Sequence, residues 1–155
     1  MELKLNSNEI RSMYDHALEE YPSECIGVIT GLPDNSAKEV SRLTNSQNDL
    51  HAQDPAHFGR DARTGYFVDP KEVFNLIRDT EKRGEKILAF YHSHPDHDAY
   101  FSKEDFAGAV MWGEPVYPGA VYIVISVLDG AVKEAVLFSW DGKEYSPSGK
   151  LPVES

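Results

Sequence analysis

The sequence predicts a single α/β domain of the α+β type, in which helices flank a mixed, mostly antiparallel sheet. Its 155 residues match the usual size of one domain. Segments with the 3.6-residue period of a helix alternate with short apolar runs that are typical of strands. The hydrophobic share of 41% is that of an ordinary globular protein. We expect one domain over residues 1–142 and a polar, weakly structured tail over residues 143–155.

The first expected element is a helix that begins after Ser7, its predicted N-cap, and ends before Pro22. Its apolar residues fall on one helical stripe: Ile10, Met13, Tyr14, Ala17, Leu18 and Tyr21. His16 lies on the polar side of this pattern, so we expect it at the surface.

A hairpin and a long connection follow this helix. Residues 25–32 are apolar and predict a buried strand, and residues 38–43 predict its partner after a turn at residues 33–35. Residues 45–68 show neither the period of a strand nor that of a helix. A connection of this length in a small domain is usually functional or mobile, so we expect it to help shape a binding groove.

The second helix has a strong start signal, with Asp69 at the N-cap and Pro70 at the first helical position. Gly84 is expected to end it. Its inward face is predicted to carry four residues: Val73, Leu76, Ile77 and Thr80. Residues 87–91 then predict a short strand that runs directly into His92.

A third helix is expected to begin at Ser102, to end near Gly113 and to turn three residues inward: Phe106, Ala109 and Val110. Residues 120–128 and 132–140 predict two further strands on either side of a turn at residues 129–130. These two strands complete the expected sheet.

The charge balance excludes several classes of partner. Fifteen basic and 26 acidic residues give a net charge of −11, which disfavours nucleic acid and an anionic membrane as partners. The charge suits a basic protein partner or a high-salt cytoplasm equally well. Cys25 is the one cysteine, so no disulfide forms within the chain and a reducing compartment is expected. With no secretion signal and no apolar run long enough to span a bilayer, we expect a cytoplasmic location.

The candidate chemistry lies between residues 92 and 105. His92 and His94 are two residues apart at a strand end, so both rings point to the same side. Asp105 begins the next helix and is able to return a carboxylate toward them. Two histidines and one carboxylate, with an open position for water, are typical of catalytic zinc. Alone, Ser102-x-x-Asp105 predicts a capping box and the histidines predict solvated side chains, but their combination favours a metal site.

This segment resembles the JAMM motif of the JAMM/MPN+ metalloproteases, also called the Mov34/MPN/PAD-1 or JAB family. The family pattern has an upstream Glu, then His-Ser/Thr-His-Pro, six residues, and Ser-x-x-Asp. The residues that match it are Glu24, His92, Ser93, His94, Pro95, Ser102 and Asp105. Gly27 keeps the family spacing from Glu24, although Ile26 stands where relatives often have Cys. The resemblance extends over about residues 5–140.

The resemblance implies an MPN/JAB1-like domain with the cytidine deaminase-like fold. It implies one Zn²⁺ per chain, held by His92, His94 and Asp105, which lowers the pKa of its water from about 15.7 toward about 7. Glu24 would take the proton of this zinc-activated water, and Ser102 would donate to the oxyanion. The compact form resembles the bacterial single-domain branch. That branch cuts a peptide or isopeptide bond after the C-terminal glycine of a small ubiquitin-like or sulfur-carrier protein.

Other functions fit parts of the same pattern. His92-x-His94-x-Asp96-His97 also matches the dinuclear metallo-β-lactamase motif, but no histidine follows His97 and the chain is short for that fold. RadC-like proteins usually have Asn between the histidines, where this chain has Ser93. A non-catalytic MPN scaffold would have lost some of the five site residues. Three further residues are expected to have no role in the metal site: Cys25 as a small buried side chain, and His51 and His57 as solvated loop residues.

Overall fold

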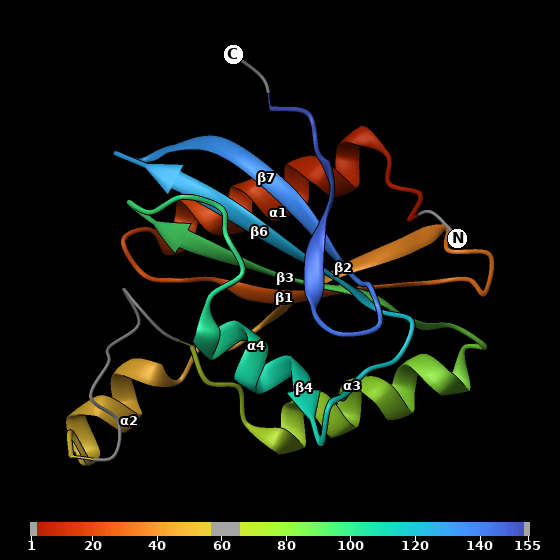
Figure 1. Ribbon diagram of the computed structural model, residues 1–155, viewed down its shortest axis with the longest axis horizontal. Helices are drawn as coiled ribbons and strands as arrows, with labels where there is room; N and C mark the ends of the chain where they lie inside the picture. Colours follow the sequence, from red (N-terminus) through yellow and green to blue (C-terminus); the bar gives the residue numbers. More distant parts are fainter. Residues whose placement is uncertain (1–2, 57–65, 154–155) are drawn as a thin grey trace.

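The computed structural model describes residues 3–56 and 66–153. A six-stranded sheet of order β2-β1-β3-β6-β7-β8 forms its centre, and a two-stranded hairpin, β4-β5, lies apart from it (Figure 1). β3 and β6 are parallel and every other neighbouring pair is antiparallel, so the predicted mixed, mostly antiparallel sheet is confirmed. The strands are β1 (Ile26–Gly31), β2 (Ala37–Leu43), β3 (Lys86–Pro95), β4 (Val110–Met111), β5 (Glu114–Pro115), β6 (Val121–Leu128), β7 (Ala131–Trp140) and β8 (Tyr145–Lys150).

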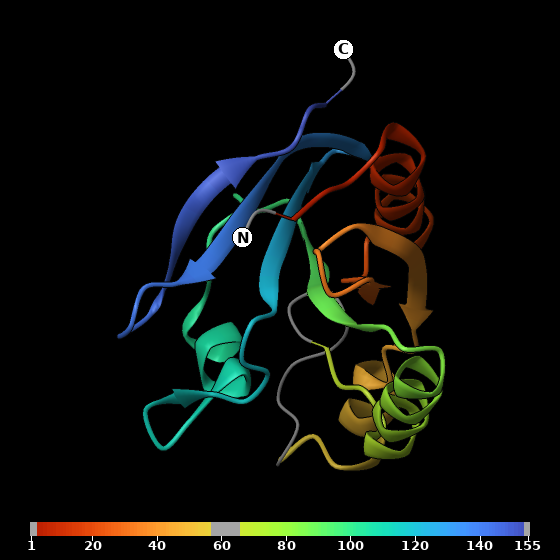
Figure 2. The same ribbon diagram turned by 90° about the vertical axis from the view of Figure 1, so that its right-hand side faces the viewer.

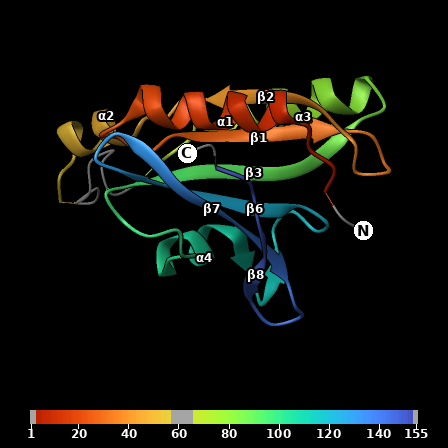
Figure 3. The same ribbon diagram turned by 90° about the horizontal axis from the view of Figure 1, so that it is seen from above.

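Helix α1 (Ser7–Glu20) covers one face of the sheet (Figure 3). It packs the buried Met13 and Ala17 against alternate residues of the central strands, among them Ile29, Tyr91 and Ile123. Its N-cap is Asn6, one residue before the predicted Ser7. Asn6 Oδ1 accepts a hydrogen bond from the Glu9 backbone N–H, and the Glu9 side chain accepts one from the Asn6 N–H.

The prediction that His16 lies at the surface is wrong. Only 2% of His16 is exposed, and its Nδ1 shares a hydrogen bond of 2.7 Å with the Tyr91 hydroxyl. Burial, with a smaller contribution from the Arg42 charge, lowers the pKa of His16 to about 4. His16 borders the apolar stripe, and the polar atom of Tyr91 inside the core gives it a partner that the helical pattern does not reveal.

Helices α3 (Pro70–Lys82) and α4 (Lys103–Ala109) lie on the other face of the sheet (Figure 2). Here Phe90 and Tyr122 form a second core with residues of both helices. Asp69 caps α3 as predicted, because its carboxylate accepts a hydrogen bond from the Lys71 N–H. Side chains alternate along β3, so His92 and His94 emerge on the same face as Phe90, beside α4.

The hairpins β1-β2 and β6-β7 confirm the four strands predicted there, but three other expectations are wrong. Residues 47–53 form a short helix, α2 (Gln47–Gln53), inside the segment expected to lack regular structure. The third helix ends at Ala109, because Val110 is extended and begins β4. Phe106, expected inward, is 36% exposed.

The expectation of a weakly structured tail is also wrong for residues 145–150. These residues form β8, which pairs with β7. Tyr145 is buried in the second core, and the rest of the strand is largely exposed. Backbone hydrogen bonds to β7 therefore keep this polar segment in a strand, although its sequence does not alternate between apolar and polar residues. In the part of the chain that the structure describes, no helix is both long and apolar enough to cross a membrane.

Candidate metal centre

Three predicted ligand atoms converge at the end of β3. His92 Nε2 lies 3.2 Å from His94 Nε2 and 3.1 Å from Asp105 Oδ2, and His94 Nε2 lies 3.4 Å from the same oxygen. Ligands at about 2.0–2.1 Å from a tetrahedral zinc stand about 3.3–3.4 Å from each other. The triangle therefore has nearly the size of one face of a zinc tetrahedron. All three side chains are buried, so a cation there would lie between nitrogen and oxygen ligands shielded from solvent.

Helix α4 brings Asp105 to the histidines. Ser102 is its N-cap: the Ser102 hydroxyl accepts from the Asp105 N–H at 3.0 Å, and the Ser102 N–H donates to Asp105 Oδ2 at 3.0 Å. The capping box and the ligand geometry therefore coexist. A carboxylate oxygen accepts more than one interaction, so Asp105 Oδ2 is oriented by a backbone N–H while it faces both histidines.

The backbone fixes His94. Its Nδ1 lies 2.9 Å from the Asp98 carbonyl oxygen, which accepts the Nδ1 proton and so directs Nε2 toward Asp105. His92 is completely buried, and its Nδ1 has no hydrogen-bond partner among the described residues. The Tyr66 ring packs against His92 with a centroid distance of 5.1 Å, which limits where that imidazole is able to turn.

Burial and neighbouring polar groups shift the pKa values of Asp105 and His94 in opposite directions. Burial raises the pKa of Asp105, but the charge of His92 and the hydrogen bonds from His92, His94 and Ser102 bring it well below its usual value. Burial lowers the pKa of His94, while the hydrogen bonds to Asp105 and Asp98 raise it, and the net shift is upward. The cluster therefore attracts positive charge, and a divalent cation competes with protons for its atoms.

Glu24 precedes β1 and is buried, so the alternative of a solvated residue at the helix exit is wrong. In the β1-β3 pairing Ile26 lies opposite His92, which carries Glu24 alongside the end of β3. One ligand atom each from Glu24, His92 and His94 lie within 4.8 Å of one another, a grouping compatible with a metal ion.

Asn45 connects Glu24 to the segment after β2, a role that the sequence did not reveal. Its side-chain amide donates to the Glu24 carbonyl oxygen at 2.8 Å, and its Oδ1 accepts from the Gln47 and Phe67 N–H groups at 3.0 and 3.1 Å. One side chain thus joins Glu24, the start of α2 and the segment before α3. An Asn in a long polar connection gives no sequence signal of such partners.

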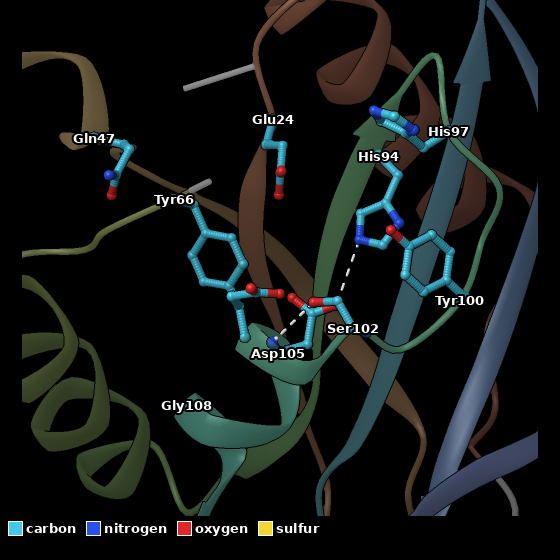
Figure 4. Close-up of a pocket in the computed structure, with 10 residues that line it drawn as sticks. Glu24, Gln47, Tyr66, His94, His97, Tyr100, Ser102, Asp105 and Gly108 are labelled. Atoms are coloured by element: carbon cyan, nitrogen blue, oxygen red, sulfur yellow. Dashed lines mark hydrogen bonds and ion pairs between the residues drawn. The ribbon is translucent and has the colours of Figure 1, made fainter. Parts of the chain in front are cut away.

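The cluster opens into a cavity of about 650 Å³ (Figure 4). Sequence reasoning missed several residues of its wall, among them Tyr66 and Tyr100, whose rings lie 5.1 Å from His92 and 4.9 Å from His94. Burial raises the pKa of Tyr66 well above its ordinary value. The lining comprises Glu24, Gln47, Tyr66, His94, His97, Tyr100, Ser102, Glu104, Asp105 and Gly108.

The remaining candidates lie elsewhere. Cys25 is buried as expected, and burial raises the pKa of its thiol to about 12. His51 lies in α2, and His57 falls outside the described residues. Asp96, a ligand in the dinuclear alternative, turns away: it accepts hydrogen bonds from the Tyr21 hydroxyl at 2.8 Å and the Asp129 N–H at 2.9 Å.

Comparison with known proteins supports the same family. The family model described as prokaryotic homologs of the JAB domain matches residues 7–141. A desampylase of Haloferax volcanii is 29% identical over 92% of this chain and 91% of its own length. A probable TtuB-protein conjugate cleaving protease of Thermus thermophilus is 31% identical over 64% and 57%. A CysO-cysteine peptidase of Mycobacterium tuberculosis is 26% identical over 82% and 75%.

Two solved structures share the fold. A Desulfitobacterium hafniense protein has a TM-score of 0.67 and 22% identity over 95% of this chain and 90% of its own. A JAB1/MPN domain protein of Archaeoglobus fulgidus has a TM-score of 0.54 and 15% identity over 98% and 97%. At such low identity these likenesses show the fold alone, whereas the family model covers most of the chain. The chain is therefore a member of the JAB family, in its prokaryotic branch.

Proposed function

We propose that this protein is a zinc metallopeptidase of the JAMM type. It would hydrolyse a peptide or isopeptide bond after the C-terminal glycine of a small ubiquitin-like or sulfur-carrier protein. The observation that carries this proposal is the triangle of His92, His94 and Asp105 atoms, 3.1–3.4 Å on a side, with the buried Glu24 beside it. All three groups are ligands that zinc favours.

Each residue has a role that its position supports. A bound Zn²⁺ supplies Lewis acidity and a water whose pKa lies near 7. Glu24 takes a proton from the attacking water and passes it to the leaving amine, since its carboxylate opens into the same cavity. Ser102 donates a hydrogen bond from its hydroxyl to the oxyanion while its oxygen keeps the hydrogen bond from the Asp105 backbone N–H.

The relatives support the substrate class. Their names describe a desampylase, a protease that cleaves TtuB–protein conjugates and a CysO-cysteine peptidase. The cavity beside the cluster is about 650 Å³, room enough for a few residues of an extended C-terminal tail.

Metal content is the first test. The protein is equilibrated with zinc, freed of loosely held ions and analysed by elemental mass spectrometry. One zinc per chain is expected in the wild type and in Glu24→Gln, which removes a base but no ligand, and His94→Ala should lose it. No retained zinc would favour the scaffold alternative, and two ions per chain would favour the dinuclear one.

Activity is the second test. The zinc-loaded protein is incubated with CysO-cysteine and with a TtuB–protein conjugate, and the products are followed by intact mass. Cleavage directly after the terminal glycine is expected for at least one carrier, and Glu24→Gln should lose it with zinc still bound. A zinc-loaded wild type that cleaves neither would contradict the proposal.

A further inference from the structure

The hairpin that follows α4 carries two apolar side chains that are largely exposed. Trp112 at its tip is 94% exposed and Met111 beside it is 61% exposed. Val110 pairs with Pro115 and Met111 with Glu114, which leaves Trp112 and Gly113 as a two-residue turn. Figure 2 shows this hairpin projecting from the molecule at the end of α4.

Backbone geometry makes tryptophan an unfavourable residue at this position. Trp112 has φ = 56° and Gly113 has φ = 76°, the left-handed conformation that such turns require at both residues. Asn, Asp or Gly adopts it readily, whereas a bulky side chain there is strained. Neither packing nor turn formation therefore accounts for Trp112, and both exposure and strain are typical of a binding residue.

The hairpin is continuous with the wall of the candidate metal centre. Glu104, Asp105 and Gly108 of α4 line the cavity, and β4 begins two residues after Gly108. At 1.5 Å per helical residue and about 3.3 Å per extended residue, the backbone from Asp105 to Trp112 spans at most about 16 Å. An extended chain of about five residues covers the same distance.

We propose that Met111 and Trp112 are the docking site for the folded body of the carrier protein whose C-terminal tail enters the cavity. This inference rests on the proposed function and adds the surface that selects the substrate. A carrier with an apolar patch at the base of its tail would cover the Trp112 ring while about five tail residues follow α4 to Asp105. Aromatic side chains that become fully buried at an interface often dominate its affinity.

A kinetic comparison tests the proposal. Trp112→Asn removes the ring but suits the positive φ, so the turn is kept. Leu18→Gln is the matched control, because Leu18 is an exposed apolar residue (39%) of α1 on the opposite face of the sheet. Each variant is assayed on the folded carrier that the wild type cleaves and on a synthetic peptide of that carrier's last six residues with the same leaving group.

The expected result is selective. Trp112→Asn should raise KM for the folded carrier about tenfold or more, leave kcat nearly unchanged and leave the peptide reaction within twofold of wild type. Leu18→Gln should stay within twofold on both substrates. Equal losses on carrier and peptide, or none on the carrier, would overturn the docking site while the proposed function stands. A wild type that cleaves neither substrate would overturn both.

Fluorescence gives an independent readout. The chain has two tryptophans, Trp112 and Trp140, and Trp140 packs against the second core. When the folded carrier is added to Glu24→Gln, the emission of Trp112 should shift to shorter wavelength as the ring leaves water. The Glu24→Gln/Trp112→Asn protein should show no such shift. An unchanged spectrum on demonstrated binding of the carrier would place the docking surface elsewhere.

Discussion

Gly27→Ala tests whether the fold needs a glycine where β1 passes the ring of Tyr91, in the strand pair that places Glu24 beside the histidines. Gly27 of β1 lies directly opposite Tyr91 of β3. A Cβ at Gly27 would overlap the far end of the Tyr91 ring, including its hydroxyl. Tyr91 is completely buried and shares its hydroxyl hydrogen bond with His16, so the ring has no open space to enter. Glycine at position 27 thus has a steric cause: the Tyr91 ring occupies the space that a Cβ would need.

The size of the effect follows from three contributions. Overpacking a buried site costs about 1–3 kcal/mol. Displacing the Tyr91 hydroxyl from His16 leaves buried polar groups unsatisfied, at about 1–3 kcal/mol. The lower entropy of the unfolded alanine chain offsets about 0.4–1 kcal/mol. Together they give a net loss of about 1–6 kcal/mol, centred near 3 kcal/mol, and the central value lowers the Tm of a chain this size by about 6–12 °C.

Urea unfolding of four proteins measures this coupling: wild type, Gly27→Ala, Tyr91→Leu and the double variant. Leucine lacks the ring atoms that the new Cβ would meet. In the Tyr91→Leu background, Gly27→Ala should therefore cost less than about 1 kcal/mol. An equal cost in both backgrounds, or no cost in the wild-type background, would refute the steric explanation.

Three further predictions concern the site and its supports. The pKa of His16 is about 4 in the fold, against an ordinary value of 6.5. The stability that neutral His16 contributes is therefore fully present above pH 6.5 and is lost as pH falls toward 4. Between pH 7.5 and 4, the free energy of unfolding of the wild type should thus fall by up to about 3 kcal/mol more than that of His16→Gln. The same pH dependence for both proteins, measured by urea unfolding, would contradict this. Asn45→Asp keeps the acceptor for Gln47 and Phe67 but loses the donor to the Glu24 carbonyl. We expect kcat to fall about tenfold with zinc content unchanged, and loss of zinc would show that Asn45 supports the ligands instead. Ser102→Ala should lose about 0.5–2 kcal/mol of stability and about 10²-fold in kcat, whereas Ser102→Gly, which still caps a helix well, should lose the same activity with little change in stability. Full activity in Ser102→Gly would leave the hydroxyl with a capping role alone.

Sequence patterns predicted most of the fold because they record local requirements. Asp69 and Pro70 mark the start of α3, and alternating or continuous apolar runs mark β1, β3, β6 and β7. β8 escaped prediction because an edge strand with one buried residue, Tyr145, carries no alternation and depends on the backbone of β7. His16 was misplaced for a related reason: its partner, Tyr91, is 75 residues away.

By itself, the sequence predicted four residues of the candidate centre. His92, His94, Ser102 and Asp105 stand at spacings that strand and helix geometry convert into a common direction, so local rules were sufficient. The tertiary structure decided what lies around them. Pairing of β1 with β3 brought Glu24 to the cluster, and the hydrogen bonds of Asn45 joined three separate segments at its side. Such contacts join residues far apart in the chain, and no local pattern records them.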